Sequence, residues 1–166
     1  GLSVLVTGRF NNVEHTILFD VGPYPQYWLD NAERLNVNLS KIECLFLSHW
    51  HFDHSGGVPE IVAAISTARE NIGLSEPLIV DLHPDRPDRP DQRGIMLSNG
   101  EIILLPLEPE IDAMMATGGR IATHSQAHTL CDCFFFGSGA IDRVTEYETG
   151  LHGHYSFFGE EAVSVL

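Results

Sequence analysis

Runs of apolar residues separated by short polar breaks predict a chain that alternates between strands and helices. Five runs are rich in aliphatic, β-branched or aromatic residues over the length of a strand. They are Leu2–Gly8, His15–Gly22, Ile42–Ser48, Glu76–His83 and Cys131–Gly139. The runs Ile42–Ser48 and Glu76–His83 are almost continuously apolar, which favours strands buried on both faces of a sheet.

Two helices are predicted between these strands. Pro25 can open the first, and apolar residues follow it at helical spacing as far as Leu35. The second covers Val58–Ile72, where aliphatic residues form one stripe and Pro59 is tolerated in the first turn. Interleaved strands and helices indicate an α/β (α+β) protein with sandwich-like layers.

Turn signals support this pattern. Asn11-Asn12 predicts a hairpin turn between the first two strands, and Asn99-Gly100 gives the stronger hairpin signal of the two. The segment Pro84–Gly94 contains three prolines and alternating charges, and therefore predicts a surface loop.

Composition limits the classes of partner. The 166 residues are 43% hydrophobic and 19% charged, which is typical of one globular domain over residues 1–166. The net charge of −14 repels phosphate backbones and anionic lipid, so neither nucleic acid nor a membrane surface is expected as a partner. Cys44, Cys131 and Cys133 do not form a disulfide framework, which favours a reducing, cytoplasmic location. The oligomeric state cannot be deduced from this composition.

Both ends of the sequence are strand-like. The chain opens with "GLSVLVTG" and closes with "EEAVSVL". We therefore expect a portion of a longer chain, with a domain that is incomplete at its C-terminus. An apolar sheet face would then be poorly covered, and Leu45, Leu47, Ile79 and Leu104 would not all be buried.

Side chains that commonly bind metals crowd the end of the third predicted strand. The segment "LSHWHFDHSGG", Leu47–Gly57, carries the pattern His-x-His-x-Asp-His at His49, His51, Asp53 and His54. Residues two apart in an extended loop point to the same side, so His49 and His51 can face one cation. Asp53 and His54 follow as the chain turns toward the helix, and would face a neighbouring second position. Imidazole and carboxylate ligands favour zinc, manganese or iron over calcium.

A solvated, histidine-rich loop is the alternative interpretation of this segment. Three imidazoles and a carboxylate at the end of a buried strand are costly unless something pairs with them. This cost favours the metal site.

These residues also carry a family resemblance. The segment Leu47–Gly57 resembles the metal-binding signature of the metallo-β-lactamase fold superfamily, and Thr16–Gly22 resembles the strand that precedes it there. Residues 1–6, 15–37 and 138–150 further resemble the branch that includes the dihydropterin–ribofuranosylaminobenzene phosphate synthases. That branch usually has Gly-Glu-Ile-Pro-Arg where residues 139–143 are Gly-Ala-Ile-Asp-Arg. If the missing glutamate contacts substrate in the branch, the assignment of the substrate weakens here.

The resemblance implies a fold and a ligand set. It implies a four-layer αββα sandwich with two divalent metals, most simply zinc, at one edge of the sheets. His49 and His51 would hold one metal, Asp53 and His54 the other, and the remaining ligands would follow the end of this sequence. Asp20 would orient ligands through hydrogen bonds. A turn or helix-capping role for Asp20 is equally compatible with the sequence.

The resemblance further implies that the full-length parent is a metal-dependent hydrolase that acts on a small molecule, anionic ones included, with Asp53 essential for catalysis. This segment alone is expected to be incomplete. Water activation would serve hydrolysis of an ester, amide, thioester or phosphoester. Transfer of a pterin methylene onto an arylamine is the synthase-like possibility, and the residues do not separate the two. Arg143 or Glu146 could bind an anionic group, although ordinary surface charge explains both.

Two other functions remain open. One is a non-catalytic or degenerate metal-binding module that lacks the second half of the site. The other is a redox di-iron protein, which would want more carboxylate ligands than this loop provides.

Three more histidines have uncertain roles. His83 ends the strand Glu76–His83 and could face substrate or metal, although a polar residue at a strand end is the simpler explanation. His152 and His154 flank a glycine and could line the mouth of a site. We favour solvated side chains for both.

The pattern His-x3-His-x2-Cys-x-Cys at His124, His128, Cys131 and Cys133 could indicate a structural zinc site. A single residue between the cysteines is tighter than usual for such a site. Buried cysteines on a strand are the favoured interpretation.

Overall fold

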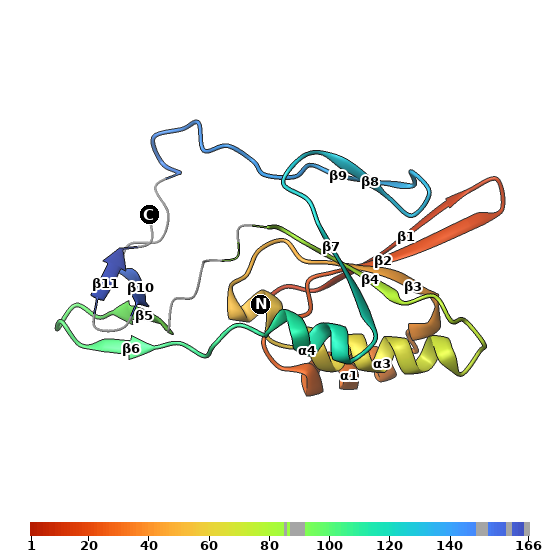
Figure 1. Ribbon diagram of the computed structural model, residues 1–166, viewed down its shortest axis with the longest axis horizontal. Coiled ribbons are helices and arrows are strands. Elements are labelled where there is room, and N and C mark those ends of the chain that lie inside the picture. The colour runs from red at the N-terminus through yellow and green to blue at the C-terminus, as the bar shows by residue number, and fades with distance from the viewer. Residues whose placement is uncertain (85, 87–91, 149–152, 159–160, 165–166) are drawn as a thin grey trace. The chain divides into compact units, whose positions relative to one another are not determined.

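The computed structural model describes residues 1–84, 86, 92–148, 153–158 and 161–164 (Figure 1). The chain forms two compact units, Gly1–Pro84 with Glu108–Ala140 and Asp85–Leu107 with Ile141–Leu166. The single domain expected from the sequence stays a prediction. Among the described residues, no helix combines the length and apolarity that crossing a lipid bilayer requires.

A five-stranded sheet forms the centre of the first unit. Its strands in spatial order are β1 (Val4–Phe10), β2 (Val13–Phe19), β3 (Ile42–Phe46), β4 (Leu78–Leu82) and β7 (Gly119–Thr123). The pair β1–β2 is antiparallel, whereas β2, β3, β4 and β7 run parallel. The carboxyl ends of these four strands therefore share one edge of the sheet, which is where open α/β sheets bind ligands.

The β1–β2 hairpin confirms the first predicted turn. Asn11 and Asn12 have φ angles of 49° and 63°. Two consecutive left-handed residues match the right-handed twist of the flanking strands, and asparagine tolerates this conformation.

Three helices pack on one face of the sheet (Figure 1). They are α1 (Pro25–Arg34), α3 (Val58–Glu70) and α4 (Ile111–Ala116). Both predicted helices are thus present, while the short α4 was not predicted. The apolar stripe of α3 is fully buried at Val58, Ile61, Val62 and Ile65. It packs with Leu18 and the inward residues of β3 and β4 in the main hydrophobic core.

A small hairpin lies on the other face of the sheet (Figure 1). It consists of β8 (His128–Leu130) and β9 (Phe135–Gly137). Leu130 packs with Ile17 and Cys44 in a second core cluster. The sheet is therefore covered on both faces at β2 and β3.

The predicted strand Cys131–Gly139 is wrong in its first part. Cys131, Asp132 and Cys133 have φ angles of 49°, 52° and 67°, and Phe134 N donates to Cys131 O at 3.0 Å. These residues form the turn between β8 and β9. The chain reverses direction here, so the cysteines are not buried strand residues: Cys131 is half-buried and Cys133 is exposed.

The second unit contains a four-stranded antiparallel sheet. Its spatial order is β11 (Glu161–Ser164), β10 (His154–Phe158), β5 (Gln92–Met96) and β6 (Ile102–Leu104). The predicted Asn99-Gly100 turn joins β5 and β6 and is confirmed. Of the predicted loop Pro84–Gly94, residues 85 and 87–91 lie outside the described residues, and β5 already begins at Gln92.

The burial of large aliphatic side chains is uneven. Leu45 and Leu47 are buried, Ile79 is half-buried and Leu104 is 53% exposed. As we expected, these four residues are not all buried. Mixed strands and helices in layers confirm the fold class predicted from the sequence.

Candidate metal centre

The loop His49–His54 leaves the carboxyl end of β3 and turns into a single helical turn. This turn, α2 (Phe52–Ser55), begins after His51, whose carbonyl accepts from His54 N at 2.9 Å and from Ser55 N at 3.0 Å. His51 is thus presented from extended backbone, and His54 from a helical turn. This change of backbone conformation brings side chains from both halves of the motif together.

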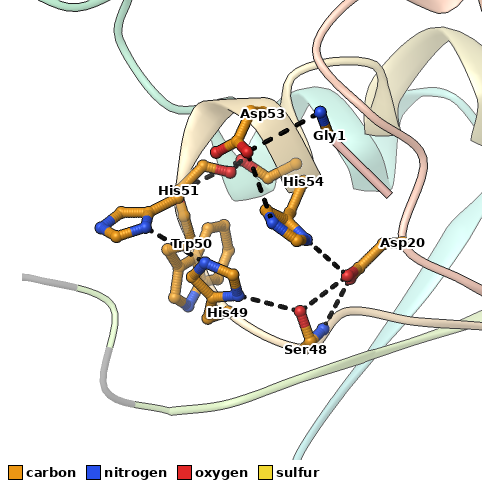
Figure 2. A network of polar contacts seen from close by, with 9 residues as sticks. Gly1, Asp20, Ser48, His49, Trp50, His51, Asp53 and His54 are labelled. Carbon is orange, nitrogen blue, oxygen red and sulfur yellow. Dashed lines mark hydrogen bonds and ion pairs between the residues drawn. The ribbon is translucent and has the colours of Figure 1, made fainter. Parts of the chain in front are cut away.

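Asp20, directly after β2, is joined by hydrogen bonds to Ser48 and His54 at the two ends of the loop (Figure 2). Its side chain is fully buried, and it accepts three hydrogen bonds: from Ser48 N at 2.8 Å, from Ser48 Oγ at 2.7 Å and from His54 Nδ1 at 2.7 Å. These donors satisfy a carboxylate that would otherwise be costly to bury. Asp20 therefore holds the start and the end of the loop at one point.

The same hydrogen bonds select the tautomers of two imidazoles. Because Ser48 Oγ donates to Asp20, its lone pair accepts from His49 Nδ1, which lies 2.9 Å away. His54 Nδ1 likewise donates to the Asp20 carboxylate. In both neutral rings Nε2 is then the nitrogen that carries the lone pair, as in metal-binding histidines whose other N–H is held by a carboxylate or hydroxyl.

The four motif side chains converge (Figure 2). His49 Nε2 lies 3.1 Å from His51 Nδ1, and His54 Nε2 lies 3.4 Å from Asp53 Oδ2. The rings of His49 and His54 are 4.2 Å apart between centroids. The structure thus pairs His49 with His51 and Asp53 with His54, while their role as metal ligands stays a prediction.

The surroundings fix one side of this cluster and leave the other open. Trp50, 4% exposed, points inward and donates from Nε1 to His83 O at 3.1 Å. The Asp53 side chain is 56% exposed, and the α-amino group of Gly1 lies 3.9 Å from its Oδ2. The cluster is therefore exposed to solvent at Asp53.

A second group of ligand-type side chains lies at the same edge of the sheet. Asp81 of β4, His124 directly after β7 and His128 at the start of β8 bring their ligand atoms within 4.8 Å of one another. We did not predict a role for Asp81. The sequence did contain a signal for such a role: Asp81 is a lone aspartate inside the apolar run "PLIVDLH", and a buried carboxylate needs partners.

A third group joins His15, Glu43 and Cys131 within the same 4.8 Å. His15 Nδ1 lies 2.8 Å from Glu43 Oε2. Burial, with the nearby Glu43 carboxylate, raises the pKa of the Cys131 thiol to about 11. A metal would have to displace this proton at neutral pH, so this group is the weaker metal candidate.

The other histidines and charges singled out in the sequence lie elsewhere. His83 follows β4 at the carboxyl edge, His154 opens β10 in the second unit, and His152 lies outside the described residues. Arg143 and Glu146 are exposed.

The motif residues fit a divalent metal by their chemistry. Three imidazoles and one carboxylate form the donor set, and two of the rings present Nε2 lone pairs that are held in place by a buried network. Nitrogen and carboxylate donors of this kind suit zinc and similar transition metals. Fold and site together define an α/β protein with a cluster of imidazole and carboxylate side chains at the carboxyl edge of a parallel sheet.

Comparison with known proteins gives the family. The chain belongs to the metallo-beta-lactamase superfamily, whose family model matches residues 1–159. It is 41% identical over 66 residues to the 7,8-dihydropterin-6-methyl-4-(beta-D-ribofuranosyl)-aminobenzene-5'-phosphate synthase of Methanocaldococcus jannaschii, covering 40% of this chain and 22% of that protein. It is 35% identical over 79 residues to the lactamase-like protein vrtG of Penicillium aethiopicum, covering 47% of this chain and 24% of that protein. The matched segments thus span less than a quarter of either relative.

Among solved structures, the chain is similar to MEM-A1, a subclass B3 metallo-beta-lactamase from a soil metagenome library. The TM-score is 0.43 at 19% identity, covering 77% of this chain and 42% of that chain.

Proposed function

We propose that this protein is a metal-dependent hydrolase with a two-metal site at the His49–His54 loop. The observation that carries the proposal is the Asp20–Ser48–His49 and Asp20–His54 hydrogen-bond relay, which holds both rings in the tautomer whose lone pair is on Nε2. An ordinary solvated loop has no need for such a relay. Zinc is the first choice of metal, with manganese or iron as alternatives.

Each residue has a distinct task in this proposal. His49 and His51 would hold one metal, and Asp53 and His54 the second. Asp20 would orient the ligands without being one of them, because it holds His54 directly and His49 through Ser48. When bound, the metals would lower the pKa of a water toward neutrality and polarise the bond to be broken. The exposed Asp53 carboxylate lies on the side from which substrate would enter.

Small molecules are the proposed substrates. The net charge of −14 disfavours nucleic acid, and bound divalent cations would offset part of it locally. The relatives include the pterin-linked synthase and an atrochrysone carboxyl ACP thioesterase from Aspergillus chevalieri. We therefore place thioesters, esters and phosphoesters first, with arylamine transfer as the synthase-like alternative. The free cysteines favour a cytoplasmic location.

The test compares Asp53→Ala with the exposed control Asp112→Ala. Metal content and turnover of esters, lactones, thioesters and phosphodiesters are measured for both variants and for the unmodified protein. Asp53→Ala should lower turnover at least about a hundredfold with the fold intact, because Asp53 serves the metal site and not the core. Asp112→Ala should behave as the unmodified protein.

The same experiment separates the alternatives. Metal bound at the loop without turnover of any substrate would support the non-catalytic module. Unchanged metal content and turnover in Asp53→Ala would overturn the two-metal assignment.

A further inference from the structure

We propose that Asp81, His124 and His128 form a second divalent-metal site, separate from the His49–His54 loop, that takes a zinc-class transition metal. Two imidazoles and one carboxylate supply three ligands, the number that sites with an open coordination position use. The proposal does not depend on the function proposed for the loop.

The fold brings the three residues together from separate segments. Asp81 lies in β4, where its neighbours across the sheet are Phe46 and Ala122. His124 follows β7, and its backbone N donates to Leu82 O at 3.1 Å. The chain then returns over the sheet, so that His128 at the start of β8 lies with Nε2 3.2 Å from Asp81 Oδ2.

His128 is packed closely into this position. It pairs with Gly137 across the β8–β9 hairpin, and a Cβ at Gly137 would lie 2.8 Å from His128 Cε1. The Phe46 ring stacks on the imidazole at 6.1 Å between centroids and 21° between planes. Only glycine leaves space for the ring at this pairing position. The orientation of His128 is therefore set by packing.

The hydrogen bond of His128 determines which nitrogen faces Asp81. His128 Nδ1 lies 3.0 Å from the carbonyl of Gln126, which can only accept, so Nδ1 carries the hydrogen. In the neutral ring Nε2 is then a bare lone pair. It is buried and makes no hydrogen bond, although Asp81 Oδ2 lies 3.2 Å away.

A lone pair that faces a carboxylate oxygen is unfavourable unless a positive charge lies between them. Asp81 is 2% exposed, so water does not screen the contact. A metal ion bound by Nε2 and the carboxylate removes the conflict. Nδ1–H held by a backbone carbonyl is also the usual support for a metal-binding histidine.

His124 completes the group from the solvent side. Its Nδ1 lies 2.9 Å from the same Asp81 Oδ2, and its side chain is 39% exposed. The two imidazole rings stack at 3.9 Å, so both present a nitrogen to one oxygen. When a metal binds, His124 would carry its hydrogen on Nε2, so the ring stays neutral.

This site replaces the zinc pattern considered from the sequence. The two histidines of His-x3-His-x2-Cys-x-Cys do converge, but on Asp81 and not with the cysteines. Cys131 and Cys133 belong to the β8–β9 turn, and the described metal group that includes Cys131 contains His15 and Glu43 instead.

The test is a titration of the chelator-treated protein with Co²⁺ alone, followed by ligand-field absorption and by measured stoichiometry. The variants are His124→Gln, Asp81→Asn, the loop double variant His49→Gln/His51→Gln and the exposed control Asp112→Asn. The unmodified protein, the loop variant and the control should each bind Co²⁺ at the Asp81 site. His124→Gln and Asp81→Asn should raise the Kd of that site at least about tenfold.

The outcomes are decisive even if one variant fails to fold. Asp81 is buried, and circular dichroism checks its variant; His124→Gln decides the matter alone because that side chain is partly exposed. Unchanged Co²⁺ affinity and stoichiometry in His124→Gln would overturn the proposal. Complete loss of Co²⁺ binding in the folded loop variant would also overturn it, because the second site should survive there.

Discussion

The His49–His54 loop and the Asp81 group use a buried aspartate in opposite ways. In the loop, Asp20 accepts three hydrogen bonds and lies behind the imidazoles. In the second group, Asp81 Oδ2 lies 2.9 Å from His124 Nδ1 and 3.2 Å from His128 Nε2. The first aspartate is a support for ligands, and the second is placed to be a ligand.

This difference shows what a buried carboxylate requires. A backbone N–H, a hydroxyl and the imidazole N–H of His54 all donate to Asp20, so its charge is compensated without any ion. The Asp81 carboxylate contacts the imidazole nitrogens of His124 and His128, and His128 is held in the acceptor tautomer by Gln126. Its compensation depends on whether a proton or a cation is present. Stability without metal should therefore differ sharply between the two sites.

The largest expected effect is on unfolding in the presence of chelator. Asp20→Asn should lower the free energy of unfolding by about 3 kcal/mol, because it weakens charge-assisted hydrogen bonds inside the protein. Asp81→Asn should cost only about 1 kcal/mol, because one hydrogen bond of good geometry is affected. Urea titrations of the two variants measure both values. Equal losses would show that the two carboxylates are compensated alike.

A smaller effect is expected from Ser48→Ala, which interrupts the relay to His49. The Kd for metal at the loop should rise by about tenfold, because His49 loses the acceptor that fixes its tautomer. Competition with a chromophoric chelator measures this change. Ser66→Ala is the matched control, since the Ser66 hydroxyl makes no hydrogen bond within the described residues. Metal affinity at the Asp81 group should not change, and a parallel loss there would contradict the separation of the sites.

The smallest effect concerns alkylation of Cys131. Its pKa of about 11 leaves little thiolate at pH 8, so its reaction with iodoacetamide should be slow and should accelerate as the pH rises toward 11. Exposed Cys133 serves as the internal reference. Added Zn²⁺ should not protect Cys131, because the metal goes to the Asp81 group. Protection, followed by mass spectrometry, would instead place a metal with His15 and Glu43.

Much of the fold could be predicted because its central elements are strongly patterned. The continuous apolar runs of β3 and β4 and the stripe of α3 reflect burial directly. The six-residue α4 is too short for a helical period, and β7, "GRIAT", mixes polar and apolar residues. Both depend on packing against α3 and β4, which no local pattern reveals.

The two sites also differ in how well the sequence predicts them. The loop is contiguous, so the spacing of its ligands is visible in the sequence. The Asp81 group joins three segments and depends on parallel pairing of β4 with β7 and on the return of β8. The sequence pattern grouped His128 with Cys131 and Cys133 instead of Asp81. The left-handed turn that contains the two cysteines could not be predicted from the apolar run.

The backbone of Asp20 also limits how this protein can change during evolution. Its φ angle of 54° is a left-handed conformation that asparagine and glycine tolerate but glutamate does not. Asparagine would keep the backbone and lose the charge, whereas glutamate would keep the charge and strain the backbone. Position 20 therefore has no conservative replacement, and no single substitution offers a gradual route away from aspartate while the loop retains its present geometry.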